Sequence, residues 1–397
     1  FRLVGPKIYT ETDHCIKSGD VNKDALEVIF RLKSAGHTAY LVGGGVRDLL
    51  LKKQPKDFDI STSARPEQIK ELFGRRCLLI GQRFRLAHVR MGNHVLEVST
   101  FRAGDADSSS LIVRDNRWGT PEEDVLRRDF TMNALFYDPT THTILDYVGG
   151  YQDIHDRLLR SIGDPHLRFK QDPVRMIRLL KFRARFNFHV DAKCEHAMHT
   201  CQEEILKSAP ARVLEEVFKM LESGYSANFF LLLSKSNFLE ILFPCFHHFF
   251  CGKDKNIAFS YLNAIDEIHH KYDMVLDRAE LLAGLVFPIL EQELIALTEH
   301  RQMTLSYGDI VHLSHSLLRG ITTSSFAHFP KKIVAITHYI LTTQYRLTPQ
   351  SGKPRFASRF SSPQDFRLAL NFLNIRSQVN PELQEIYLSW KKAHHSS

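Results

Sequence analysis

Hydrophobic and polar positions are patterned in two different ways along this 397-residue chain. Over roughly the first 150 residues, stretches with apolar residues every three or four positions are mixed with short stretches of alternating apolar and polar residues. Beyond that point nearly every patterned stretch has the helical period. The pattern therefore predicts an α+β N-terminal region followed by an all-helical region.

The mixed region is divided by glycine, proline and capping residues into short elements. Ser63 is expected to cap a helix that has Pro66 in its first turn, and Thr120-Pro-Glu-Glu123 has the pattern of a capping box for another. Residues 102–118 lack periodicity, which predicts a mobile loop. Residues 347–360 are rich in Ser, Pro and Arg, which predicts a linker or an exposed loop. The predicted helices are 21–35, 46–51 and 67–73, the strands are 38–42 and 57–60, and a hairpin joins 83–91 to 94–101.

Composition indicates a globular protein with several domains. Hydrophobic residues make up 43% and charged residues 24%, and Lys plus Arg exceed Asp plus Glu by 52 to 45. The resulting charge of +7 weakly favours a polyanionic partner. No apolar run reaches the roughly 18 residues of a membrane span, and Phe1 begins no signal-peptide pattern. We therefore expect no membrane association, a cytoplasmic protein, and a natural chain that begins upstream of Phe1.

The six cysteines include no CxxC pair. This spacing argues against a zinc ribbon or a disulfide scaffold and favours free thiols in a reducing compartment. In Cys245-Phe-His-His-Phe-Phe-Cys251, the interleaved aromatic residues predict a core helix rather than a metal site.

Asp57-Phe58-Asp59 is the first candidate for chemistry. On a strand, both carboxylates project to one face while Phe58 enters the core. Two negative charges so close repel each other unless a cation lies between them, and Mg²⁺ prefers carboxylate and phosphate oxygens. A pair of such ions could activate an attacking 3′-hydroxyl and neutralise a triphosphate leaving group. Two solvated loop aspartates are the alternative that this spacing alone leaves open.

A glycine-rich turn precedes the aspartates, in Leu41-Val-Gly-Gly-Gly-Val-Arg-Asp48. A strand that ends in three glycines and leads into a helix presents backbone N–H groups to a phosphate. Arg47 can bind phosphate oxygens through its forked guanidinium. A tight turn with Arg47 in solvent is the alternative, but the nearby aspartate pair favours a phosphate site that includes Gly44 and Arg47.

Two later segments carry further charged candidates. In Arg127-Arg-Asp129, an arginine beside a carboxylate could bind a nucleotide or only hold a helix by an ion pair. Asp172, Arg175 and Arg178 recur every three residues, so on a helix they cover roughly 120° of one face. An aspartate and an arginine together can read the edge of a base. Alternatively, Asp172 is an N-cap before Pro173 and the arginines lie in solvent.

A third carboxylate beside Asp57 and Asp59 has two candidates, Glu97 and Asp129. Glu97 lies in Val95-Leu-Glu-Val-Ser-Thr-Phe101, where strand alternation would point it from one face of the sheet. Strand geometry therefore favours Glu97.

Four segments, in order, resemble the motifs of one known family. They are Gly43-Gly-Gly-Val-Arg-Asp48, Asp57-Phe-Asp59, Arg127-Arg-Asp-Phe-Thr-Met-Asn-Ala134 and Asp172-Pro-Val-Arg-Met-Ile-Arg178. Together they are similar to the class II tRNA nucleotidyltransferase and bacterial poly(A) polymerase family, within the superfamily typified by DNA polymerase beta. The matched stretch, 41–188, covers over a third of the chain.

The resemblance implies a fold and a set of roles. The fold would be a nucleotidyltransferase head of the DNA polymerase beta type with an N-terminal extension (1–150), a helical neck for base recognition (151–215), a helical body (216–345), and a linker with RNA-binding helices (346–397). The resemblance favours Asp129 over Glu97, so the expected catalytic residues are Asp57, Asp59 and Asp129, with Mg²⁺ on Asp57 and Asp59. The expected nucleotide ligands are Gly44, Arg47, Arg128, Asp172, Arg175 and Arg178. Lys181 stands where the family usually has an arginine, and a lysine offers only a point charge.

The stretch Leu79-Ile-Gly-Gln-Arg-Phe-Arg-Leu-Ala-His-Val89 looks like the one that separates bacterial poly(A) polymerases from CCA-adding enzymes. Gln82 departs from the usual basic residue, and the rest is intact. The resemblance thus implies a monomeric enzyme that adds AMP from ATP to an RNA 3′ end. A CCA-adding enzyme, which shares the chemistry, is the alternative. The C-terminal segment 391–397 is short where many polymerases have a strongly basic tail, which a longer natural chain or a different way of holding RNA would explain. A non-catalytic RNA-binding protein is a third possibility, and no HD pair indicates a phosphohydrolase domain.

Overall fold

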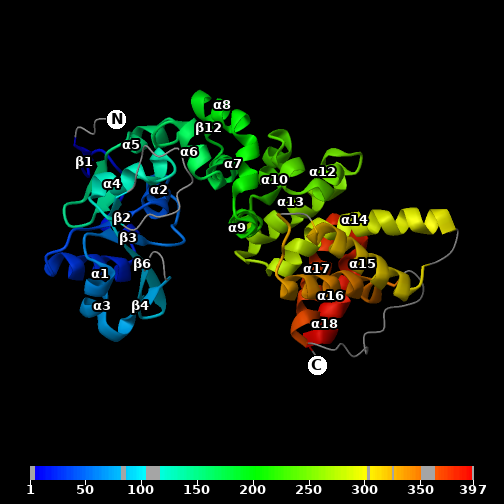
Figure 1. Ribbon diagram of the computed structural model, residues 1–397. Helices are drawn as coiled ribbons and strands as arrows, with labels where there is room; N and C mark the ends of the chain where they lie inside the picture. The colour runs from blue at the N-terminus through cyan, green and yellow to red at the C-terminus, as the bar shows by residue number, and fades with distance from the viewer. Residues whose placement is uncertain are drawn as a thin grey trace. The chain divides into compact units, whose positions relative to one another are not determined.

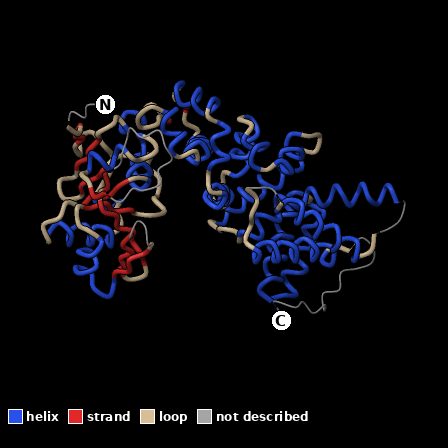
Figure 2. The backbone as a smooth tube through the Cα atoms, in the orientation of Figure 1, coloured by secondary structure: helices blue, strands red, loops and turns tan. Residues whose placement is uncertain are grey.

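The chain divides into two units in the computed structural model, which describes residues 5–81, 86–103, 117–301, 305–323, 326–349 and 363–395. One unit comprises Phe1–Leu179 and Asn187–Ile205, and the other comprises Leu180–Phe186 and Leu206–Ser397. Every strand that the structure describes lies in the first unit, and the second is built from helices (Figures 1 and 2). The predicted order of an α+β region before a helical region is confirmed. The finer division at residues 150, 215 and 345 stays a prediction.

An eight-stranded sheet forms the centre of the first unit, in the order β1-β10-β9-β2-β3-β6-β5-β4. All neighbouring strands run antiparallel except β3 and β6, which are parallel. Two small pairs, β7 with β8 and β11 with β12, lie outside it. The strands are β1 Lys7–Tyr9, β2 Ala39–Val42, β3 Asp59–Thr62, β4 Cys77–Ile80, β5 Leu86–Met91, β6 His94–Thr100, β7 Arg102–Ala103, β8 Arg117–Trp118, β9 Phe136–Asp138, β10 Thr143–Asp146, β11 Leu158–Leu159 and β12 His189–Val190.

Helices pack around this sheet, and of the two caps predicted from the sequence, at Thr120 and at Ser63, only the first is formed. Asn22 Oδ1 accepts from the amides of Asp24 and Ala25 at the start of α1, and Thr120 caps α4 as predicted. Ser63 does not cap α3, because Arg65 precedes that helix and Ser63 Oγ accepts from the amide of Thr38 instead. The helices of this unit are α1 Lys23–Ser34, α2 Gly44–Leu50, α3 Pro66–Phe73, α4 Pro121–Leu126, α5 Gly150–His155, α6 Pro165–Gln171, α7 Val174–Phe186 (which continues into the second unit) and α8 Ala192–Thr200, with 3-10 turns η1 Ser18–Asp20, η2 Gly74–Arg76, η3 Thr131–Asn133 and η4 Gln202–Lys207.

One buried cluster lies under the central strands and fixes several segments at once. It contains Val42 at the end of β2, Phe101 after β6, Val125 on α4 and Phe136 on β9. The edge of Phe101 meets the face of Phe136, with ring centroids 5.9 Å apart. Because these residues flank the glycine turn and the 127–134 segment, the cluster holds both segments against the same sheet.

The second unit packs its helices around large aromatic side chains. Phe287 on α14 contacts the rings of Tyr261, Tyr345 and Phe372, which come from α13, α16 and α17. All four rings lie in helices that are adjacent in the structure. The helices are α9 Pro210–Leu221, α10 Ser226–Lys235, α11 Phe238–Leu242, α12 Pro244–Cys251, α13 Lys255–Tyr272, α14 Arg278–Arg301, α15 Tyr307–Thr322, α16 Lys331–Leu347, α17 Pro363–Val379 and α18 Gln384–His395, with the 3-10 turn η5 Pro381–Leu383.

Helix α14 departs from the expectation that no apolar run is long enough for a membrane. Its stretch Arg278–His300 has 23 residues and contains an 18-residue window with a mean hydropathy of 1.6, sufficient by length and composition to span a bilayer. However, 61% of that stretch is buried inside the protein, and Pro288 interrupts it. Its apolar side chains pack against α13, α16 and α17, so α14 serves as a core helix of the second unit.

The prediction of free thiols agrees with the structure. All six cysteines are free thiols. In α12, Phe246, Phe249 and Phe250 are buried whereas Cys245 and Cys251 are exposed, so this stretch is a core helix as predicted. Residues 82–85, most of the predicted loop 102–118 and most of the predicted linker 347–360 lie outside the described residues.

Candidate active site

The glycine turn joins β2 to α2 and lies directly against the aspartate segment. Gly43 has φ 68° and ψ −131°, a left-handed conformation that favours glycine. A Cβ on Gly45 would lie 3.3 Å from the carbonyl oxygen of Asp57 and 3.9 Å from Cα of Phe58. The close approach of backbone to backbone therefore explains the run of glycines, and it fixes the turn relative to Asp57.

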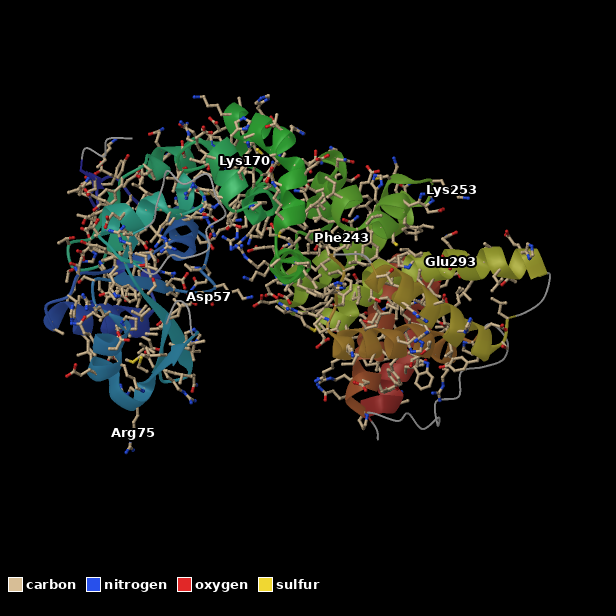
Figure 3. The ribbon with its side chains drawn as sticks, in the orientation of Figure 1. Asp57, Arg75, Lys170, Phe243, Lys253 and Glu293 are labelled. Carbon is tan, nitrogen blue, oxygen red and sulfur yellow. The ribbon has the colours of Figure 1, made fainter. Side chains whose placement is uncertain are left out.

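Asp57 and Asp59 are placed differently from the predicted strand. Strand β3 begins at Asp59, which pairs with Val42 at the end of β2, so Asp57 and Phe58 precede it. Asp57 is exposed at the surface of this unit (Figure 3), and Phe58 is only half-buried rather than part of the core. Both aspartates nevertheless line one open pocket of about 710 Å³.

Asp59 carries the signature of a crowded acidic site. Burial, followed by the charges of Glu97 and Asp57, raises the pKa of Asp59 to about 6. The guanidinium of Arg128 opposes that rise. A cation bound between Asp59 and the neighbouring carboxylates would stabilise the ionised form of Asp59 and lower its pKa again.

Glu97 is the third carboxylate of this pocket. Strand β6 runs parallel to β3 with Ile60 opposite Val98, and continuing that register by one residue puts Glu97 next to Asp59 on the same face. On the other side, His88 pairs with Glu97, and its Nε2 lies 4.0 Å from Glu97 Oε2. The acidic and histidine residues that line the pocket are Asp57, Asp59, His88, His94 and Glu97.

Asp129 points into a different environment. It accepts hydrogen bonds from Asn133 Nδ2 (3.1 Å) and from the amide of Phe130, and Arg178 Nη1 lies 3.7 Å from its Oδ2. Although burial opposes it, the charge of Arg178 and the hydrogen bond from Asn133 hold the pKa of Asp129 below its ordinary value. The structure therefore groups Asp129 with arginines, whereas the pocket of Asp57 and Asp59 contains Glu97.

Arg128 links the glycine turn to the central strands. Its guanidinium donates to Asp124 Oδ2 (2.8 and 3.1 Å), to the carbonyl of Asn133 (3.2 Å) and to Ser61 Oγ (3.4 Å). A Cβ on Gly43 would lie 3.4 Å from its Nη1. Arg128 is thus held beside the turn and close enough to Asp59 to lower its pKa, which suits a group that binds phosphate.

Arg47 is buried rather than directed into solvent. Its Nε and Nη2 donate to Asp48 Oδ1 (2.9 and 2.7 Å), and its Nη1 donates to Asn133 Oδ1 (2.6 Å). Only 4% of Arg47 is exposed. In this structure Arg47 stabilises the glycine turn through its hydrogen bonds to Asp48 and Asn133. The predicted contact with phosphate oxygens would require those bonds to rearrange.

The three residues predicted to read a base are brought together at the start of α7. Asp172 lies between α6 and α7, and its carbonyl accepts from the amide of Arg175. Arg175 is buried and donates from Nη2 to the carbonyl of Arg127 (3.0 Å). Arg178 is a third exposed and faces Asp129. Lys181 lies further along α7 and pairs with Glu216.

The residues around Asp57 and Asp59 fit a magnesium site that a substrate completes. In the part of the chain that the structure describes, no three His, Cys, Asp or Glu side chains are arranged to enclose a metal ion. Mg²⁺ commonly binds through one or two carboxylates and takes its other ligands from phosphates and water. Two aspartates with a neighbouring glutamate and a raised pKa match that donor set.

Two supporting residues were missed by the sequence interpretation. Asn133 joins Arg47 to Asp129, and Arg168 donates to the carbonyls of Leu126 and Arg128. Asn133 lies inside the 127–134 motif, so its place in that motif could have marked it as a candidate site residue. Arg168 precedes Asp172 by one helical turn, and nothing in its spacing distinguishes it from a surface arginine.

Comparisons with known proteins agree with this geometry. The poly A polymerase head domain matches residues 39–160, and the probable RNA and SrmB-binding site of polymerase A matches residues 187–250. Poly(A) polymerase I of Salmonella typhimurium is 36% identical over 96% of this chain and 84% of that protein. A CCA-adding enzyme of Lactobacillus helveticus is 38% identical over 51% of this chain and 51% of that protein.

Among solved structures, the CCA-adding enzyme of Bacillus stearothermophilus in complex with CTP is similar, with a TM-score of 0.67 and 26% identity over 94% of this chain and 82% of that chain. The mixed sheet, the glycine turn and the paired aspartates define a nucleotidyltransferase. The similarity to poly(A) polymerase I, 36% identical over 96% of the chain, shows to which family of nucleotidyltransferases the chain belongs. The chain belongs to the bacterial poly(A) polymerase I family.

Proposed function

We propose that this protein extends RNA 3′ ends with AMP taken from ATP, without a template and with release of pyrophosphate. The observation that carries the proposal is the acidic pocket of Asp57, Asp59 and Glu97 next to the glycine turn and Arg128. The extent of similarity supports adenylation over CCA addition, because the poly(A) polymerase relative aligns over 96% of the chain and the CCA-adding relative over 51%.

In the proposed reaction, the RNA 3′-hydroxyl oxygen bonds to the α-phosphorus of ATP as the bond to the β-phosphate oxygen breaks. Asp57 and Asp59 would hold Mg²⁺, which when bound supplies positive charge for the hydroxyl and the pyrophosphate. Arg128 and the amides of the turn around Gly44 would hold phosphates. Glu97 is the third acidic group in this proposal, instead of Asp129, because Glu97 lies beside Asp59 and Asp129 is engaged by Arg178 and Asn133.

Asp172, Arg175 and Arg178 are proposed to select the base, as the resemblance implies. The side chain of Arg178 is a third exposed and could contact a ligand, whereas Arg175 is buried and donates to the backbone carbonyl of Arg127. Arg47 is proposed to support the turn from within. We further propose that the protein acts in the cytoplasm as a monomer on RNA, which light scattering and RNA-binding assays would test.

The test is extension of a labelled unstructured RNA in Mg²⁺ with each nucleotide supplied singly. Long products from ATP alone are expected from the wild type and from an exposed-residue control, Glu71→Ala, and none from Asp57→Ala. An Asp57→Ala protein that still extends RNA would refute the assigned role of the aspartates.

CCA addition remains the second candidate because about half of the chain is also similar to a CCA-adding enzyme. Addition of CMP from CTP to a tRNA that lacks its 3′ end, stopping after a fixed number of nucleotides, would replace the first proposal. A protein that binds RNA but releases no pyrophosphate with any nucleotide would favour the non-catalytic alternative.

A further inference from the structure

The segment that follows helix α4 is held by arginines from the helices that carry the base-reading residues. Helix α4 ends at Leu126, and carbonyls at the end of a helix need partners from outside it. Arg168 Nη2 donates to the carbonyls of Leu126 (3.0 Å) and Arg128 (2.9 Å), and Arg175 Nη2 donates to that of Arg127 (3.0 Å). Three consecutive carbonyls are therefore fixed by two guanidinium groups.

The same segment carries the Arg128 side chain toward the glycine turn. One end of Arg128 is held through its backbone carbonyl by Arg168, and the other through its guanidinium by Asp124 and the carbonyl of Asn133. Rotation or displacement of this segment would move Arg128 away from Gly43 and Ser61. The position of a phosphate-binding group thus depends on a contact from α6.

Burying the charged guanidinium of Arg168 costs desolvation free energy, so its presence here indicates that its hydrogen-bonding geometry is needed. It is only 4% exposed, and burial, followed by the charge of Arg175, lowers its pKa to about 9. An apolar side chain of similar volume would avoid the desolvation of a cation. Its planar fork also donates from Nη1 to Gln171 Oε1 (3.0 Å), an arrangement that the single ammonium of a lysine cannot reproduce.

We infer that Arg168, on the helix α6 that leads directly into the base-reading helix α7, is a positioning residue that couples this part of the chain to the phosphate-binding Arg128, so that both ends of an incoming nucleotide meet groups set by one junction. The inference rests on the proposed binding of nucleotide at Arg128. Arg168 itself touches no substrate in this scheme. It acts through the carbonyls of Leu126 and Arg128, while Arg175 steadies the carbonyl between them.

A double-mutant cycle on the binding of Mg·ATP tests the coupling, with the four proteins wild type, Arg168→Lys, Arg128→Met and the double variant. Arg168→Lys keeps the charge and most of the volume, which favours folding, and thermal unfolding of each protein checks it. We expect Arg168→Lys to weaken binding roughly tenfold in the wild-type background and less than about twofold when Arg128 is already Met. Arg31→Lys, which replaces an exposed arginine on α1, should bind as wild type does.

Equal losses in both backgrounds would show that Arg168 supports the fold in general, and unchanged binding by Arg168→Lys would show that the fork is not needed. Either result overturns the inference while the proposed function stands. A wild-type protein that binds no ATP would overturn the proposed function first. In RNA extension, the expected change is in the KM for ATP with the KM for RNA unaltered, a separation that general loss of structure would not produce.

Discussion

The acidic pocket and the arginine junction of the first unit are built in opposite ways. Asp57 precedes β3, Asp59 begins it and Glu97 lies within β6. All three line an open pocket, where burial and the charges of Glu97 and Asp57 raise the pKa of Asp59 to about 6. Arg168 and Arg175 are buried, and each donates to backbone carbonyls. The difference indicates that the hydrogen bonds of the arginine junction are made within the folded protein, whereas the like charges of the acidic pocket favour binding of a cation.

The largest expected effect follows from removing a charge of the acidic pocket. Asp59→Asn should lower RNA extension by roughly 1,000-fold or more, because a carboxylate that holds metal has no substitute in an amide. Its thermal stability should be equal to or above that of the wild type, since crowded like charges are relieved. Turnover in Mg²⁺ and calorimetric unfolding measure the two quantities, and a destabilised Asp59→Asn protein would contradict the comparison.

Arg128→Met tests the side of the comparison that faces phosphate. Loss of one positioned cation should reduce kcat/KM for ATP by roughly 100-fold. The pairing of Asp124 with Arg128 is also lost, so we expect a moderate loss of stability. Steady-state kinetics with ATP varied checks the first effect, and an activity within a few fold of the wild type would remove Arg128 from the site.

Asp129→Asn should behave in the reverse way from Asp59→Asn. Because the side chain of Asp129 is partly buried and lies beside Arg178, the substitution should cost roughly 3 kcal/mol of folding free energy. Activity of the protein that remains folded should fall only about tenfold. Urea unfolding and extension assays in parallel decide this. A stable Asp129→Asn protein without any activity would restore Asp129 as the third metal carboxylate, in place of Glu97.

The pH dependence of stability without metal sharpens the same contrast. The folded-state pKa of Asp59 is raised from 3.8 to about 6, so the stability linked to its protonated form is full below pH 3.8 and is lost as pH rises through about 6. The change should be about 1–3 kcal/mol after allowance for solvent screening. Unfolding at pH 5 and pH 7 in the wild type and in Asp59→Asn measures it, and added Mg²⁺ should restore stability at pH 7 in the wild type only.

The smallest effect is expected at Lys181, where the family usually has an arginine. Lys181 pairs with Glu216 within the second unit, so Lys181→Arg should keep that pairing and leave extension within about twofold of the wild type. Lys181→Met is the matched comparison, because it leaves Glu216 with no cation at this position. A large loss with Lys181→Arg would mean that the lysine has a specific role.

Local patterns were sufficient to predict the elements around the site. Helical periodicity located α1, and the capping box at Thr120 located the start of α4. The boundary of β3 was wrong by two residues, since alternation alone cannot show that Asp57 and Phe58 lie before the ladder to β2 begins. Ser63 was assigned to a cap that it does not form, because its partner is the amide of Thr38 on another strand.

The arrangement of the site depended on contacts that no local pattern contains. Strand geometry pointed to Glu97, but only the parallel pairing of β6 with β3 shows that Glu97 adjoins Asp59. The inward direction of Arg47 could not be predicted, because its partner Asn133 lies 86 positions away. The role of Arg168 could not be predicted either, because its acceptors are backbone carbonyls of distant residues, which no side-chain pattern marks.

The strand order of the sheet has a consequence for how the protein is made. Strand β1 pairs with β10 through Lys7 and Asp146, and β2 pairs with β9 through Leu41 and Tyr137. During synthesis, β1 and β2 leave the ribosome well before these partners, so the nascent chain carries open strand edges until residue 146 has emerged. The sheet that carries the acidic pocket can therefore be completed only late in translation of the first unit.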